Sequence, residues 1–415
     1  MRVLQVSESD RIGGAALAAL RLNNALNQRG VNSTLLVNRK MSDDSTIISP
    51  VGFLAKFLAR IKPHLYIWRS KNKFDSNYLS IASNASSSIF LDNIYPFTYN
   101  ILHLHWVNNG FVRLHDLVNF KKPIIWTLHD TWLFTGGCHS TQGCKQFLDD
   151  CSSCPKSNSN NGRLNLYRQF LAKNQILSLL TNKVTFTVPS TWMLESAQKS
   201  SLLKDFRIVK IPNMINTDVF RQLNKKDVML ELGLNTSYKY FVFGATNPLG
   251  DLNKGFAYLR TVFQQNDYSG YKLIIFGKSK FDPETININI EVVFWNEIDS
   301  DEKLCKIYNA AEVLLMPSVH ESFGQVAAEA MSCGVPVVCF DTTGLKDIVE
   351  HKKNGYLATL GNQDDFNEGI KWVLNNKNDN LSIQGRDKIV SDFSPNTVCK
   401  MFVELYNKQN QYAKT

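Results

Sequence analysis

The sequence predicts an α/β protein made of two doubly wound domains, each with a parallel sheet between layers of helices. Three observations support this fold class. The chain has 415 residues, which is too long for one ordinary hydrophobic core, so about two domains are expected. Hydrophobic residues make up 44% of the chain, which is ample for globular packing. Short apolar runs alternate with helical stretches in two series, separated by a break near residues 190–240.

The apolar runs predict the strands of the two sheets. Most are continuous rather than interrupted by polar residues, which is typical of strands covered by helices on both faces. In the first series the expected strands are residues 2–6, 33–37, 101–105, 123–129 and 184–190. In the second they begin with YFVFGA at residue 240 and continue at 272–277, 292–295, 313–318 and 335–340. The expected domains are residues 1–200 and 201–394, with a C-terminal helix at about 395–415 that packs back onto the first.

The N-terminus and the hydropathy pattern indicate where the chain resides. MRVLQVSESD reaches polar and acidic residues too early for a signal peptide, and no run of about 18 apolar residues predicts a transmembrane helix. We expect a cytoplasmic protein, with peripheral attachment to the inner face of the plasma membrane as a further option.

The positive charge is concentrated in the N-terminal half. Residues 1–190 carry 21 Lys and Arg against 10 Asp and Glu, a net +11, and the remainder carries 25 against 27, a net −2, which sum to +9. Residues 51–73 place five apolar side chains on one helical face among Lys and Arg, with no acid. Such a helix either lies on an anionic membrane or packs on the sheet with its basic side chains in solvent.

Four of the eight cysteines lie close together in GGCHSTQGCKQFLDDCSSCP, with the spacing C-x5-C-x6-C-x2-C. Four thiolates at such spacing can surround a tetrahedral Zn²⁺, so Cys138, Cys144, Cys151 and Cys154 are candidate ligands of a structural zinc ion. His139 is a spare ligand. Reduced thiols without metal and a disulfide pair are the alternatives.

Two glutamates eight residues apart mark a candidate site in HESFGQVAAEAMSCGVPVV, residues 320–338. The stretch follows an expected strand, and ligands of open α/β sheets bind beyond the carboxyl ends of strands. Gly324 opens a helix whose first N–H groups suit a phosphate, and Glu329 lies a turn further on, within reach of a ribose hydroxyl. The alternative is structural: Glu321 caps the helix and Glu329 is a surface residue.

The run ESFGxxxxEAMxxGxPVV resembles the E-x7-E region of retaining glycosyltransferases of the GT-B fold, family four (group 1), of the kind that builds bacterial surface polysaccharides. Further motifs occur in the family's order along nearly the whole chain. They are the glycine pair at 13–14, TLHD at 127–130, VPSTW at 188–192, IPNMINTDVF at 211–220, NKGF at 253–256 and LCKIYNAAEVLLMPS at 304–318. The resemblance implies two Rossmann-like domains that face each other across a cleft.

The resemblance also implies roles for individual residues. Glu321 contacts the transferred sugar, His129 faces that sugar from the N-terminal domain, and Lys254 stabilises the departing diphosphate. Glu329 holds the ribose, and no metal ion takes part in the transfer. The full set of expected donor-binding residues is Gly13, Gly14, Asn247, Lys278, Ser322, Phe323, Gly324, Gln325, Val326 and Glu329. For His129, a buried core histidine is the alternative interpretation.

This sequence departs from the family at a few positions. Leu249 stands where many relatives have an arginine, so a second positive charge on the diphosphate must come from elsewhere, and Lys278 is the candidate. Asp299, Ser300 and Asp301 match a metal-binding D-x-D only superficially, because acids at this place suit the start of the following helix.

The predicted function is transfer of a hexose from a UDP- or GDP-sugar to a glycan acceptor, in the synthesis of capsule, exopolysaccharide or O-antigen. The basic N-terminal half and residues 51–73 motivate an acceptor linked to a polyprenyl diphosphate lipid. A nucleotide-sugar epimerase of the same fold and a non-catalytic carbohydrate-binding protein are the alternatives. Nucleic acid is not an expected partner, since no aromatic-rich basic motif of a known reader module occurs.

Overall fold

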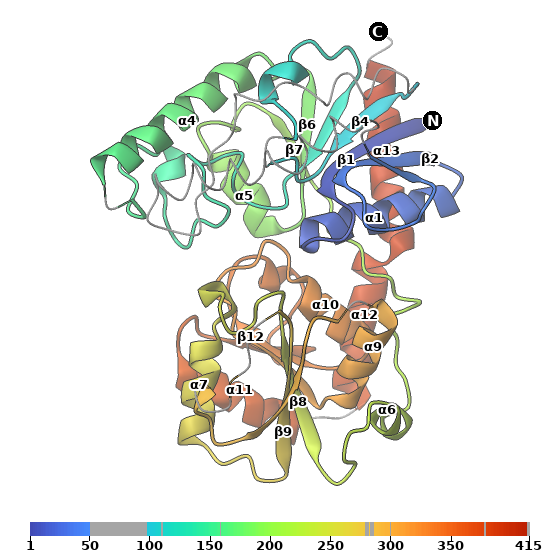
Figure 1. Ribbon diagram of the computed structural model, residues 1–415, viewed down its shortest axis with the longest axis vertical. Helices are drawn as coiled ribbons and strands as arrows, with labels where there is room; N and C mark the ends of the chain where they lie inside the picture. Colours follow the sequence, from blue (N-terminus) through green and yellow to red (C-terminus); the bar gives the residue numbers. More distant parts are fainter. Residues whose placement is uncertain are drawn as a thin grey trace. The chain divides into compact units, whose positions relative to one another are not determined.

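The computed structural model describes residues 1–49, 98–108, 111–157, 159–278, 282, 286–298, 300–376 and 379–412. The chain forms two compact units: unit 1 comprises Met1–Pro212 with Cys399–Thr415, and unit 2 comprises Asn213–Val398. The unit boundaries therefore lie at 212/213 and 398/399, where the sequence suggested 200/201 and 394/395. Figure 1 shows both units as sheets covered by helices.

Unit 1 is built on a seven-stranded sheet in the order β3-β2-β1-β4-β5-β6-β7, in which neighbouring strands are parallel. The strands are β1 (Arg2–Ser9), β2 (Asn32–Arg39), β3 (Ile47–Ile48), β4 (Ile101–Leu104), β5 (Ile124–Thr127), β6 (Val184–Val188) and β7 (Arg207–Lys210). The helices are α1 (Gly14–Gln28), α4 (Asn160–Ser178), α5 (Thr191–Lys199) and α13 (Pro395–Tyr412), with short 3-10 turns at Leu114–Leu117 and Gln146–Leu148.

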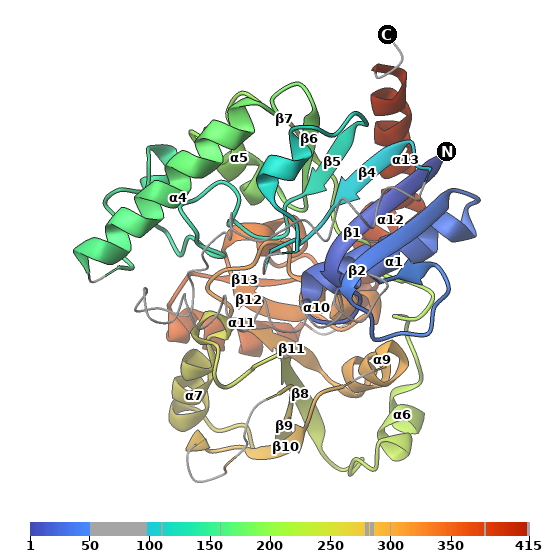
Figure 2. The same ribbon diagram turned by 45° about the horizontal axis from the view of Figure 1, so that its top comes forward.

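The two faces of this sheet differ in chemistry. One face is apolar: alternate strand residues such as Leu4, Leu102 and Trp126 pack with α4 and α5 in one core cluster. On the other face Gln5 pairs in register with Leu35 of β2 and with His103 of β4. This second face carries polar side chains on several strands, and α1 and α13 lie over it (Figures 1 and 2).

Hydrogen bonds tie the C-terminal helix to the polar face. The Tyr406 hydroxyl on α13 lies 2.7 Å from His103 Nδ1, and His103 Nε2 lies 2.8 Å from the hydroxyl of Thr127 on β5. Further along α13, Gln409 donates to the hydroxyl of Thr185 on β6, at 3.0 Å. Buried polar groups need such partners, and α13 supplies them to His103 and Thr185.

Unit 2 is built on a six-stranded parallel sheet in the order β10-β9-β8-β11-β12-β13. The strands are β8 (Lys239–Gly244), β9 (Tyr271–Phe276), β10 (Glu291–Trp295), β11 (Val313–Met316), β12 (Val337–Phe340) and β13 (Gly355–Ala358). The helices are α6 (Lys225–Glu231), α7 (Phe256–Gln265), α9 (Asp301–Ala310), α10 (Gln325–Ser332), α11 (Gln363–Asn375) and α12 (Asp379–Phe393), with 3-10 turns η3 (Leu252–Lys254) and η4 (Thr343–Asp347).

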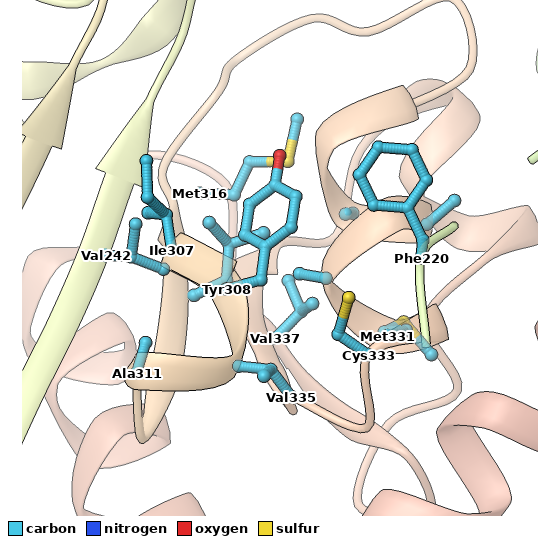
Figure 3. Packing of buried hydrophobic residues seen from close by; sticks show 14 of the residues in the cluster. Phe220, Val242, Ile307, Tyr308, Ala311, Met316, Met331, Cys333, Val335 and Val337 are labelled. Atoms are coloured by element: carbon cyan, nitrogen blue, oxygen red, sulfur yellow. The ribbon is translucent and has the colours of Figure 1, made fainter. Parts of the chain in front are cut away.

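Both faces of the second sheet are apolar, which explains its continuous hydrophobic runs. Phe241 and Phe243 of β8 pack with α7 and α11, whereas Tyr240 and Val242 pack on the opposite face with α6, α9, α10 and α12. Figure 3 shows this second core, where Tyr308 lies among side chains of several elements, with Phe220 at 6.2 Å between ring centroids. A parallel sheet with helices on both sides is a doubly wound fold, as predicted.

The strands that sequence patterning missed are short. Only two residues form β3, and β7 begins and ends with exposed Arg207 and Lys210, so neither presents a continuous apolar run. The strand β13 has four residues beginning with Gly355. The basic stretch 51–73 lies outside the described residues. Among the residues that are described, no helix is long and apolar enough to cross a membrane.

His103 should make the stability of unit 1 depend on pH. Its side chain is fully buried, and burial, reinforced by the nearby His129, lowers its pKa to about 3. Below pH 6.5, His103 binds a proton in the unfolded chain but stays neutral in the folded chain. The free energy of unfolding therefore falls as pH drops from 6.5 towards 3. Between pH 7 and 5 this residue should account for about 2 kcal/mol of the loss.

Chemical denaturation of the wild type and of His103→Gln at pH 7 and pH 5 measures the effect. The variant should be less stable at pH 7 but should lose less free energy of unfolding on acidification. Equal losses in the two proteins would contradict the assignment.

Candidate functional site

The strongest candidate site in unit 2 is an ion pair between loops that follow two neighbouring strands. Lys254, at the end of η3, places its Nζ 2.7 Å from Oε1 of Glu321, which follows β11. The side chains are only 26% and 14% exposed. Burial lowers the pKa of Lys254, but Glu321 and Asp251 outweigh it and leave that pKa above its ordinary value. Lys254 is therefore a cation at neutral pH.

A close backbone approach brings the lysine to this place. Gly255 follows Lys254 with a φ of 71°, and a Cβ there would lie 2.0 Å from the carbonyl oxygen of Pro317. The backbone N–H of Val319 donates to the carbonyl of Asn253 at 2.9 Å, which joins the two loops directly. The glycine of the NKGF motif is thus required by space as well as by its left-handed conformation.

The loop of Glu321 is also held from the other side. The Glu321 N–H donates to the hydroxyl of Thr343 at 2.9 Å, and the Gly344 N–H donates to the Glu321 carbonyl at 2.9 Å. Gly324 has a φ of 106°, and a Cβ on it would lie 2.6 Å from Leu345. Both contacts fix the backbone between Glu321 and the start of α10.

The predicted residues of the α10 N-terminus differ in what they present. Phe323 is buried and its ring packs on Phe393 at 5.4 Å, so only its backbone can meet a ligand. Ser322, Gln325 and Val326 are partly exposed. The Gln325 Nε2 is buried and has no hydrogen-bond partner among the described residues. A helix N-terminus with an additional unused donor suits an anion.

Glu329 lies in a different environment from Glu321. It is 3% exposed, within α10, and its Oε2 accepts a hydrogen bond from the Tyr308 hydroxyl of α9 at 3.1 Å. The expectation of an exposed structural glutamate is wrong for this position. A role in holding ribose stays a prediction.

Asn247 and Lys278 lie on neighbouring loops. Asn247, after β8, accepts from the Gly250 N–H at 3.1 Å. Lys278, after β9, donates its backbone N–H to the Thr246 carbonyl at 2.8 Å, and its Nζ pairs with Glu297 at 2.6 Å. Since that pair is more than half exposed, it contributes little stability and can be exchanged for another anion.

The second acid of the D-x-D sequence, Asp301, lies at the start of a helix. Ser300 caps α9 by accepting from the Lys303 N–H, and Asp301 lies in the first helical turn. Asp299 lies outside the described residues. Acids in this position favour the helix through its dipole, which is the structural interpretation.

In unit 1, His129 follows β5 and joins two other polar residues. Its Nε2 lies 3.0 Å from Nδ1 of His105, whose Nε2 lies 2.8 Å from Oε1 of Gln5. Burial lowers the pKa of His129 to about 4 against the opposing effect of Asp130, and burial also lowers the pKa of His105. These imidazoles are neutral at pH 7.

Asp130, next to His129, organises the loop that follows. Its carboxylate accepts from Trp106 Nε1 at 2.8 Å, from the Trp132 N–H at 2.9 Å, and lies 2.7 Å from His139 Nδ1. Burial by itself would raise the pKa of Asp130. His139 and the hydrogen-bond donors have the larger combined effect, so the pKa of Asp130 lies below its ordinary value. Asp130 thus engages the Nδ1 of His139, and the role of His139 as a spare zinc ligand stays a prediction.

The glycine pair of unit 1 opens α1. Gly13 is the residue before the helix, with a φ of 86°, and a Cβ there would have nothing within 4 Å. Gly14 is the first residue of α1. The left-handed backbone favours glycine at position 13, and the open space leaves room for a ligand to approach.

The four clustered cysteines meet around one small cavity. Cys138, Cys144, Cys151 and Cys154 all line it, together with Gly136, whose N–H donates to the Cys151 sulfur at 3.2 Å. All four are free thiols, and all but Cys144 are buried. In the described part of the chain, however, no three or more His, Cys, Asp or Glu side chains are arranged to hold a metal ion. The zinc site stays a prediction.

The structure thus brings Lys254, Glu321 and the α10 N-terminus together in unit 2, and His129 with Gln5 and His105 in unit 1. Sequence reasoning missed Gln5, His105 and Thr343. The alternation in ILHLH, which puts two histidines on one face of a buried strand, was the available signal for His105.

Comparison with known proteins finds a family match within the second unit. Residues 249–388 match the family model "Glycosyl transferases group 1". Uncharacterized glycosyltransferases of Methanocaldococcus jannaschii and Haemophilus influenzae are 39% and 30% identical, over 21% and 34% of this chain. The matches span only 23% and 41% of those two proteins' own lengths. The putative colanic acid biosynthesis glycosyl transferase WcaC of Escherichia coli is 24% identical over 84% of this chain and 85% of its own.

Solved structures agree with the whole fold. Sucrose-phosphate synthase from Thermosynechococcus elongatus superposes with a TM-score of 0.73 at 18% identity, covering 100% of both chains. Anabaena Alr3699/HepE in complex with UDP-glucose gives a TM-score of 0.63 at 16% identity, covering 98% of this chain and 100% of that one. The fold is GT-B, and within it residues 249–388 match the group 1 glycosyl transferase model.

Proposed function

We propose that this protein is a retaining glycosyltransferase that moves a hexose from a nucleotide sugar to a glycan acceptor in cell-surface polysaccharide synthesis. The observation that carries the proposal is the partly buried Lys254–Glu321 pair beside the N-terminus of α10, within residues 249–388. The similarity to WcaC, a putative colanic acid biosynthesis glycosyl transferase, supports the polysaccharide context.

In the proposed reaction the donor diphosphate binds at the α10 N-terminus. The backbone N–H groups from Gly324 to Val326, the unused Gln325 amide and the Lys254 ammonium supply donors for it. As the bond between the sugar C1 and the diphosphate oxygen breaks, negative charge builds on the leaving group. Preorganised cations and N–H groups stabilise that charge more than the ground state.

Glu321 is proposed to orient the sugar. Its pairing with Lys254 keeps the carboxylate within reach of both the sugar and the phosphate-binding lysine. A bond forms from the sugar C1 to the acceptor oxygen with retained configuration, and the acceptor proton leaves with the diphosphate or solvent. We assign no metal ion to this step.

Other predicted residues complete the donor site in this proposal. Glu329 binds the ribose, and its hydrogen bond from the Tyr308 hydroxyl is either replaced or kept beside the new contact. Lys278 gives up the exposed Glu297 to supply a second positive charge. Ser322 and Phe323 contribute backbone groups, Asn247 lies on the adjoining loop, and Gly13, Gly14 and His129 contribute from unit 1.

The donor is proposed to be a UDP- or GDP-sugar, for which the UDP-glucose complex of HepE is the supporting precedent. The acceptor is proposed to be a glycan on a polyprenyl diphosphate lipid, used in the cytoplasm at the inner face of the plasma membrane. The net +11 of residues 1–190 supports this location, since anionic lipids attract basic surfaces.

A structural zinc ion on the four cysteines is proposed as well. Their convergence on one cavity and the N–H donor to Cys151 suit thiolates, although binding would have to draw the four sulfurs closer together. The ion would brace the loop after His129 and take no part in transfer.

Replacing the central lysine tests the proposal most directly. Lys254→Met should lower kcat about 100-fold or more, because a preorganised donor to the leaving group is lost. Glu321→Gln should also lower sugar transfer, since the amide cannot keep the ion pair. The measurement is product formation from nucleotide sugars, with and without added glycan acceptor.

Lys371→Met is the matched control, since Lys371 forms an exposed ion pair with Glu368 on α11. It should retain wild-type activity. Wild-type rates in Lys254→Met would contradict the proposal, and a sugar altered without any acceptor would indicate an epimerase instead.

Donor binding should be visible as thermal stabilisation. A nucleotide sugar at about 100 times its dissociation constant should stabilise the folded chain by roughly 2.7 kcal/mol. A screen of UDP- and GDP-sugars by differential scanning fluorimetry measures this, and Lys254→Met should shift less than Lys371→Met. Equal shifts in both variants would remove Lys254 from the donor site.

Metal analysis tests the zinc proposal. Protein purified under reducing conditions should contain about one zinc per chain by atomic emission, and Cys154→Ser should lose it. Cys399→Ser, a buried cysteine of α13 outside the cluster, should keep the metal. Metal-free wild-type protein that folds and transfers sugar would show that the thiols act without zinc.

A further inference from the structure

Gln5, His105 and His129 form a chain of hydrogen bonds across three neighbouring strand positions of unit 1. Gln5 lies on β1, His105 follows β4, and His129 follows β5. The two links measure 2.8 Å and 3.0 Å, and the His105 and His129 rings stack with 5.3 Å between centroids. Gln5 is fully buried and His105 is 3% exposed.

The amide of Gln5 gives this chain a direction. Its Nε2 donates to the hydroxyl of Ser33 at 2.9 Å and to Oδ1 of Asn23 at 3.4 Å. Its Oε1 therefore faces His105. A carbonyl oxygen only accepts hydrogen bonds, so the Nε2 of His105 must carry the proton.

The donor-to-acceptor order of these hydrogen bonds continues from His105 to His129. A neutral imidazole has one N–H and one acceptor nitrogen, so Nδ1 of His105 is an acceptor. The Nε2 of His129 must then donate to it, and Nδ1 of His129 is left with a lone pair. Among the described residues, that Nδ1 has no hydrogen-bond partner.

The rings are neutral because they are buried together. Burial lowers the pKa of His129 to about 4, and burial together with the two neighbouring histidines lowers the pKa of His105. A second proton on His105 would also set its Nδ1–H against the Nε2–H of His129. Each ring thus holds one proton at neutral pH.

We infer that Gln5 and His105 are positioning residues that hold His129 as the Nε2–H tautomer, so that its Nδ1 accepts a hydrogen bond from a hydroxyl group of the transferred sugar. This inference rests on the proposed function, in which His129 faces that sugar. It makes His129 an acceptor for a neutral hydroxyl rather than an acid or a cation. Donor sugars that lack the hydroxyl would leave Nδ1 unpaired and should react more slowly.

The tautomer can be measured directly on the full chain without any substrate. Nitrogen NMR of protein labelled with ¹⁵N-histidine distinguishes protonated from unprotonated ring nitrogens, and the signals of His129 are those missing from His129→Gln. The wild type should show His129 protonated at Nε2. Protonation at Nδ1 in the wild type would overturn the inference, whatever the variants do.

Variants test the source of the tautomer. Gln5→Leu and His105→Phe should each let His129 populate both tautomers, and Gln5→Glu, which keeps an acceptor oxygen, should restore Nε2–H. Tyr406→Phe is the matched control, because it removes a hydroxyl from the adjacent His103 but not from the chain. It should leave the His129 signals as in the wild type. A single unchanged tautomer in folded Gln5→Leu and His105→Phe would overturn the inference.

Kinetics separate this inference from the proposed function. Gln5→Leu should lower kcat/KM for sugar transfer about tenfold, and Gln5→Glu should recover most of it. A wild-type chain with the Nε2–H tautomer but no transferase activity would contradict the proposed function alone. An active chain with the other tautomer would contradict the inference alone.

Discussion

Parallel pairing of the strands is the constraint on which both candidate sites depend. Because neighbouring strands of each sheet run in the same direction, the loops that follow them all emerge on one side, at the carboxyl ends of the strands. In unit 2 this side collects Lys254 after β8, Glu321 after β11 and Thr343 after β12. In unit 1 it collects His105 and His129 after β4 and β5. The reactive side chains are thus assembled by topology, and glycines with little space around them set the final distances.

The two sheets achieve this with different interiors. Unit 2 is apolar on both faces, and its site is held mainly by backbone hydrogen bonds between loops. Unit 1 keeps one face polar, where His103 hydrogen-bonds to Thr127 and to Tyr406 of α13, and Gln5 hydrogen-bonds to His105. A buried polar network of this kind costs stability when any member is unpaired, and it therefore specifies a single arrangement of its side chains. A single arrangement of side chains is what the site needs if His129 is to present Nδ1, rather than Nε2, to a ligand.

The sequence predicts the doubly wound fold because short continuous apolar runs alternate with helical stretches in both halves. It fails at β3 and β7, where pairing at the sheet edge stabilises segments without an apolar run. Lys254 and Glu321 are recognisable from their motifs, but their direct contact crosses 67 positions and depends on the Gly255 approach to Pro317. The Gln5–His105 contact spans 100 positions and has no local signal. The sequence pattern likewise could not show that Phe323 and Glu329 are buried, because distant residues such as Phe393 and Tyr308 cover them.

The bond between His103 and Tyr406 joins residues 303 positions apart, with the whole of unit 2 between them in the chain. On a ribosome, residues 1–212 emerge before unit 2, yet the polar face of their sheet lacks its covering helix until unit 2 has also been made. Unit 2, whose residues are contiguous, has every partner it needs earlier. The unit made first is therefore the one that matures last. In the interval its buried histidine and threonine groups are open to water, and the slow closure of this very long loop sets the order in which the protein becomes complete.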